Sequence, residues 1–91
     1  MSATVRIPTP LRSATNGEST VTTEGGTLGD VVSDLERQHP GIAERLLADD
    51  GGLRRFVNVF VDDEDVRFQQ GLQTSVPDGS VVSIIPAVAG G

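Results

Sequence analysis

One stretch of the sequence, residues 27–39, has the spacing of a single amphipathic helix, and it limits the folds open to so short a chain. Its apolar residues recur at intervals of three and four, which places them on one helix face: Leu28, Val31, Val32 and Leu35. Thr27 followed by Asp30 approximates a capping box, with Asp in place of Glu. Pro40 predicts that the helix ends just after His39. One helix cannot bury its own apolar face, so the rest of the chain must cover it.

Strand-like patterns stand on both sides of this helix. Strands are predicted at residues 3–8, 19–23, 56–61 and 81–85, with a shorter one at 66–68. Turns are predicted at 16–17, 62–65 and 77–79, and Ile42, Leu46 and Leu47 suggest a further helical turn on the same core. The order is hairpin, helix, strand, short strand, strand. It predicts an α+β fold: a mixed sheet of four to five strands with one main helix across one face.

Composition excludes several kinds of function. The 91 residues contain no cysteine, so disulfides, thiolate nucleophiles and cysteine-based metal sites are ruled out. His39 is the only histidine, and lysine is absent, so the chain offers no ε-amine as an isopeptide acceptor. The seven arginines are scattered along the sequence and aromatic residues are few, which argues against a nucleic-acid partner. The net charge of −6 suits docking to a basic protein surface.

Targeting signals are not apparent in the sequence. No signal peptide follows Met1, and no apolar run approaches the length of a membrane span. We therefore expect a soluble, cytoplasmic protein without a membrane partner. A folded domain is predicted for residues 1–86, followed by a flexible tail at 87–91.

The tail is the strongest candidate for a functional site. It consists of Ala87, Val88, Ala89, Gly90 and Gly91. Glycine has no Cβ, so a glycine pair can pass through a channel too narrow for side chains. Five residues beyond Pro86 reach at most about 17 Å when fully extended. We expect the α-carboxylate of Gly91 to be the working group, presented to a partner's active site; the alternative is a frayed end or a cloning remnant.

A tail of this kind needs a docking surface beside it. If Val59, Val61, Val82 and Ile84 face the helix, alternation places Phe60 and Ile85 on the opposite face of the sheet. Phe60 and Ile85 are therefore predicted docking residues, and Pro86, which stands between Ile85 and the tail, is predicted as a third. A second small core beneath a loop is the alternative explanation for Phe60 and Ile85.

Three other motifs are better explained by structure than by chemistry. Residues 25–30 are rich in glycine but lack the lysine of a phosphate-binding loop, so a capped strand-to-helix turn is favoured. Residues 62–65 are acidic, but Arg67 stands where calcium coordination needs an oxygen ligand. His39 suits the negative end of a helix dipole. No catalytic residue, metal site or bound cofactor is expected.

The element order and local motifs resemble the β-grasp, ubiquitin-like sulfur carriers of the MoaD/ThiS family. The matching stretches are 26–28 with the following helix, 57–63, 77–82 and 85–91, and the final Pro-x-Val-Ala-Gly-Gly is the most specific of them. Within the family, residues 56–68 and 84–91 look closest to the CysO-type carriers of actinobacterial cysteine biosynthesis. The resemblance covers essentially the whole chain.

This resemblance implies a protein co-substrate rather than an enzyme. An E1-like adenylyl- and sulfurtransferase of the MoeB/ThiF type, which itself binds ATP and Mg²⁺, would adenylate the Gly91 carboxylate. Sulfide or a persulfide would then displace AMP and leave a thiocarboxylate. A cysteine synthase or a thiosugar synthase would accept the sulfur, and a metalloprotease would release the product.

The residues leave other functions open. Sulfur transfer for thiosugars, thiamin, molybdopterin or tRNA needs the same tail, as does a ubiquitin-like modifier that is conjugated to other proteins. A small subunit of a molybdopterin synthase would insert its tail in the same way. A plain interaction module with an inert tail is the alternative of a different class.

Overall fold

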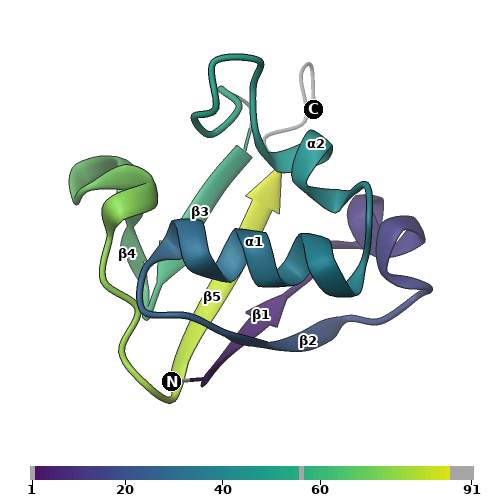
Figure 1. Ribbon diagram of the computed structural model, residues 1–91, viewed down its shortest axis with the longest axis horizontal. Helices are drawn as coiled ribbons and strands as arrows, with labels where there is room; N and C mark the ends of the chain where they lie inside the picture. Colours follow the sequence, from purple (N-terminus) through teal and green to yellow (C-terminus); the bar gives the residue numbers. More distant parts are fainter. Residues whose placement is uncertain (1, 56, 87–91) are drawn as a thin grey trace.

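The computed structural model describes residues 2–55 and 57–86. Its strands are β1 (Ser2–Arg6), β2 (Thr20–Glu24), β3 (Val57–Val61), β4 (Glu64–Asp65) and β5 (Ser80–Pro86), joined in one sheet in the order β2-β1-β5-β3-β4 (Figure 1). The β1–β5 pair is parallel and the other pairs are antiparallel, so the sheet is mixed as predicted.

Two α-helices connect the two halves of the sheet. The longer one, α1 (Leu28–Gln38), runs across one face of the sheet, and α2 (Ile42–Leu46) follows it (Figure 1). Thr27 caps α1 as predicted: its Oγ1 accepts a hydrogen bond from the Asp30 backbone N–H, at 3.2 Å. His39 ends the helix, which confirms the boundary inferred from Pro40.

The core lies between α1, α2 and one face of the sheet. All four residues of the predicted helix stripe are buried, as are Ile42 and Leu46 of α2. Val59 and Val61 of β3 and Val82 and Ile84 of β5 are buried as well, which confirms the predicted alternation. This arrangement is the predicted α+β layout, a mixed sheet with one main helix across one face.

The region after β3 differs from the prediction. Residues 66–68 were expected to form a strand, but they form a 3₁₀ helix, and the short strand β4 lies before them at Glu64–Asp65. Asp62 and Asp63 adopt left-handed backbone angles, with φ of 49° and 73°, and make the tight turn that pairs β4 with β3. The Asp65 carboxylate then accepts the Arg67 backbone N–H at 2.9 Å, which begins the 3₁₀ turn and ends the strand. Two further 3₁₀ helices, Thr9–Thr15 and Gly71–Gln73, lie in segments predicted as connections.

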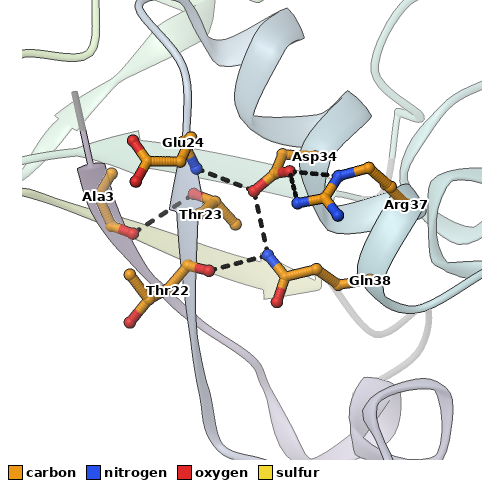
Figure 2. A network of polar contacts seen from close by, with 7 residues as sticks. All are labelled: Ala3, Thr22, Thr23, Glu24, Asp34, Arg37 and Gln38. Carbon is orange, nitrogen blue, oxygen red and sulfur yellow. Dashed lines mark hydrogen bonds and ion pairs between the residues drawn. The ribbon is translucent and has the colours of Figure 1, made fainter.

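Side chains of α1 bind the outer edge of β2 (Figure 2). The Asp34 carboxylate accepts the Glu24 backbone N–H at 2.9 Å, and Gln38 Nε2 donates to the Thr22 carbonyl at 2.9 Å and to Asp34 at 3.0 Å. The hydrogen bond from the Glu24 N–H holds the pKa of Asp34 below its usual range, and the bond from the Arg37 guanidinium contributes a smaller lowering. These bonds fix α1 to the sheet and occupy edge groups that could otherwise pair with another strand.

A second carboxylate, that of Glu36, joins α1 to α2. It accepts the backbone N–H groups of Gly41 and Ala43, each at 2.9 Å. These two hydrogen bonds lower the pKa of Glu36 from its usual value, and the bond from Ala43 has the larger effect. The ionised form of Glu36 therefore stabilises the turn between the helices.

Replacing Glu36 by Gln is expected to make stability less dependent on pH. Because the folded-state pKa is lowered, the stabilisation is fully present above the unfolded pKa near 4.5 and is lost as the pH falls through the folded value. Urea unfolding of both proteins at several pH values should show a gap that is widest near about pH 7 and closes in acid. A gap of constant size at every pH would contradict this role of the Glu36 charge.

Candidate functional site

The candidate site is built around the end of β5. This strand lies between β1 and β3 and ends at Pro86, whose backbone is paired with that of Val57 (Figure 1). The chain therefore leaves the middle of the sheet, beside the start of β3. The predicted tail, residues 87–91 with Gly91, lies outside the described residues, and so does the side chain of Pro86.

The face of β3 and β5 that points away from α1 carries the other predicted docking residues. Here we call Asn58, Phe60, Val81, Ser83 and Ile85 the outer sheet face. Ile85 is 49% exposed and Val81 is 38% exposed, whereas the remaining three are partly buried. Exposed apolar side chains on a sheet face are a feature of binding surfaces when they occur together.

Phe60 and Ile85 lie on this face, as alternation predicted. In the antiparallel register Phe60 stands opposite Ser83, and Ile85 stands opposite Asn58, so Phe60 and Ile85 are diagonal neighbours. Such neighbours are close enough for an aromatic and a long aliphatic side chain to act together. Their role in docking remains a prediction.

Val81 was missed in the sequence, although the same alternation identifies it. Val81, Ser83 and Ile85 share one face of β5, and only the two ends of this set are apolar. Phe68 was missed as a surface residue because residues 66–68 were expected in a strand. In the 3₁₀ helix its side chain is 86% exposed, while that of Val66 is fully buried.

Arg67 holds the beginning of β3 in place, a role that the sequence did not indicate. Its Nη2 donates to the carbonyls of Arg54 at 2.5 Å and Val57 at 2.8 Å, and its Nη1 donates to Asn58 Oδ1 at 3.2 Å. The β4 pairing reaches only Phe60 and Val61 on this edge of β3. The guanidinium thus occupies edge carbonyls that β4 leaves unpaired, directly beside the end of β5.

The remaining motifs have structural roles. Gly25 and the capped Thr27 form the turn into α1, as predicted. The turn predicted at 62–65 is confined to Asp62 and Asp63, because Glu64 and Asp65 pair with β3 as β4. His39 Nε2 lies 3.7 Å from Glu18 Oε2 at the C-terminus of α1. Within residues 2–55 and 57–86, no three side chains of the metal-binding types gather closely enough to hold an ion. No helix in the same part of the chain is long and apolar enough to cross a bilayer.

Comparison with known proteins places this chain in a family. The model of the ThiS family matches residues 5–91, which is nearly the whole chain and includes the tail. The sulfur carrier protein CysO of Mycobacterium tuberculosis is 55% identical over 93 aligned positions that span all of both chains. The small archaeal modifier protein 3 of Haloferax volcanii is 40% identical over 68 residues, covering 75% of this chain and 73% of that protein.

A solved structure agrees with these sequence relationships. A chain in the crystal structure of the Amycolatopsis orientalis BexX/CysO complex superposes with a TM-score of 0.93 and 49% identity, covering 98% of this chain and 99% of that one. Both the order of elements and their arrangement in space are therefore shared with a solved structure, and the predicted β-grasp fold is confirmed.

Proposed function

Because this chain belongs to the ThiS family, we propose that it is a sulfur carrier protein that acts in cysteine biosynthesis. The observation that carries this proposal is the 55% identity to a sulfur carrier protein over all of both chains, together with a family match that extends to residue 91. Sulfur carrier proteins are not enzymes themselves. We propose that this one acts as a co-substrate of partner enzymes, in the cytoplasm.

The chemistry proposed for Gly91 follows from the properties of a carboxylate. A carboxylate is a poor electrophile, so its oxygen first attacks the α-phosphorus of ATP and pyrophosphate leaves. The resulting acyl adenylate has a good leaving group, and hydrosulfide attacks its carbonyl carbon as AMP departs. The product is a thiocarboxylate at Gly91. The absence of cysteine supports this scheme, because no thiol of the same chain can attack the activated end.

ATP and Mg²⁺ are assigned to an E1-like partner of the MoeB/ThiF type. The glycine-rich turn at Gly25 is fully explained by the entry into α1, and the sequence there lacks the lysine of a phosphate-binding loop. The acceptor proposed is a cysteine synthase, and the metalloprotease that releases the product is proposed on family resemblance. The solved BexX/CysO complex supports the general point that carriers of this type assemble with other proteins.

A protein modifier is the second candidate function. It is favoured by the 40% identity to small archaeal modifier protein 3, which covers three quarters of this chain. The two functions need the same activated tail and differ in the nucleophile that takes it, sulfide or a lysine amine. Covalent adducts of the chain with other proteins, resistant to reducing agent, would favour the modifier.

Sulfur loading is tested by intact-mass measurement. The purified chain is incubated with the adenylating partner, ATP, Mg²⁺ and sulfide, and exchange of oxygen for sulfur at the activated acyl group should add about 16 Da. Omission of ATP is the control and should leave the mass unchanged. Absence of the mass gain with a partner that demonstrably forms AMP would refute the proposal.

Replacing Ile85 by Asp is expected to weaken docking without unfolding the domain. Ile85 is 49% exposed, so its substitution should change stability little, whereas removal of an apolar side chain from the centre of an interface costs about 2 kcal/mol or more. We expect KM for the carrier in the adenylation reaction to rise about 30-fold. Thr22→Asp, exposed on the edge strand β2, is the control and should retain the original KM. An equal rise in both variants would argue against docking through the outer sheet face.

A further inference from the structure

The fold gathers arginines that are far apart in the sequence at the end of the sheet where β5 finishes. Arg6 ends β1 and is paired in register with Ser83, so it lies on the same sheet face as Ser83 and Ile85. On the other side, Arg67 reaches Asn58, the residue opposite Ile85. Arg54 and Arg55 stand three and two residues before Val57, the first residue of β3, which is paired with Pro86. Arg6, Arg54, Arg55 and Arg67 are all exposed, and we call them the arginine collar.

The opposite end of β5 carries the reverse charge. Asp62 Oδ1 accepts the Val81 backbone N–H at 2.9 Å, and Asp78 Oδ1 accepts that of Ser2 at 2.8 Å. Asp63 completes the turn after β3, and Glu64 begins β4 directly after it. The Ser2 N–H also lowers the pKa of Asp78, which keeps that carboxylate ionised. The start of β5 is therefore acidic and its end is basic.

At physiological salt, the charges at the two ends of β5 act on a partner independently of each other. β5 spans seven residues, which at about 3.3 Å each separates its ends by roughly 20 Å. The Debye length at physiological ionic strength is about 8 Å, so a partner at one end is largely screened from charges at the other. Carboxylates also lie near the collar in sequence. Asp65 accepts the Arg67 backbone N–H at 2.9 Å, and Asp49 and Asp50 precede Arg54. The Arg67 guanidinium itself points to Asn58, and Arg6 adjoins the outer sheet face.

From this arrangement we infer that the arginine collar docks against an acidic rim around the tail-binding channel of the adenylating partner. The inference rests on the proposed function, because it concerns the partner that receives Gly91. The net charge of −6 alone would suggest that the partner's docking surface is basic. The end of β5, from which the tail enters the partner, nevertheless carries local positive charge. A basic rim would place like charges opposite the collar, and the two surfaces would repel each other. A neutral rim would remove water from the guanidinium groups without supplying a charged partner in its place. A protein that holds Mg²⁺ also carries carboxylates near its active site.

The test compares two variants with the same net charge. Arg6→Gln with Arg55→Gln removes two collar charges, while Gln70→Glu with Gln73→Glu adds two negative charges to exposed residues of the segment that follows the Val66–Phe68 turn. Both variants carry a net charge of −8, from −6 − 2. The association rate with the purified adenylating partner is measured by stopped flow from low to physiological salt. The collar variant should associate about tenfold more slowly at low salt, with a flatter salt dependence, and the control should associate within about twofold of the original.

Each outcome has a separate meaning. Equal slowing of both variants would show that net charge governs association, and no slowing or faster association of the collar variant would indicate a neutral or basic rim; all three overturn the inference. The sulfur-loading assay is run in parallel on the original chain, whose mass should rise by about 16 Da. Loading that succeeds while the collar variant associates normally refutes the collar alone. Loading that fails refutes the proposed function.

Discussion

Deletion of Gly91 is expected to abolish sulfur loading while leaving the fold intact. The deletion leaves a glycine carboxylate at residue 90, but places it one residue, about 3.5 Å, short of its position in the partner's active site. Displacement of a reacting group by even 1 Å costs about a hundredfold, so the rate of AMP-dependent loading should fall by at least that factor. The measurement is the initial rate of mass gain at fixed partner and ATP.

Two controls separate length from stability. Gly91→Ala keeps the length of the tail and adds one Cβ, so any loss of loading in this variant reports the width of the channel rather than its depth. The thermal unfolding midpoint of both variants should equal that of the original chain, because the described strand pairing ends at Pro86. Loading of the deletion variant at the original rate would mean that Gly91 is not the reacting residue.

Gly25→Ala is expected to destabilise the fold by about 2–4 kcal/mol. Gly25 has a φ of +154°, and a Cβ built there would lie 2.7 Å from the Asp30 Cβ and 3.0 Å from backbone atoms of α1. A side chain at this position therefore adds backbone strain of about 1–3 kcal/mol and forces the turn away from the helix. The measurement is the free energy of unfolding in urea.

The neighbouring glycine is a matched control. A Cβ added at Gly26 meets no atom within 4 Å, and this residue is not among those with positive φ. Gly26→Ala should therefore change stability by less than about 1 kcal/mol. Similar losses in the two variants would show that flexibility of the turn, rather than close approach to α1, explains the glycines.

The parts of the fold that depend on local patterns were predictable. The stripe on α1 and its Thr27 cap involve residues within one or two turns, and the alternation in β3 and β5 identified both the buried valines and the exposed Ile85. These signals arise because burial on one side repeats with the period of the helix or strand. The order of elements was sufficient to predict a mixed sheet with one main helix.

The parts of the fold that depend on contacts between residues distant in sequence could not be predicted. Residues 66–68 have strand-like composition, but the buried Val66 and the Asp65 bond to the Arg67 N–H turn the chain into a 3₁₀ helix. The hydrogen bonds from Arg67 to Arg54 and Val57 span 13 and 10 residues, and no local pattern indicates them. The members of the arginine collar likewise appeared scattered in the sequence, because they come to the same end of the sheet only when β1, β3 and β5 pair.

The central claim is that sulfur is loaded on the terminal acyl group of Gly91, and the arrangement of arginines permits a direct measurement. Arg67 is the last arginine and the chain has no lysine, so cleavage after arginine releases residues 68–91 as one peptide. After loading, fragmentation of this peptide should place the whole gain of about 16 Da on the final residue. A gain located on any other residue, or loaded protein whose peptide 68–91 has its original mass, would contradict the account.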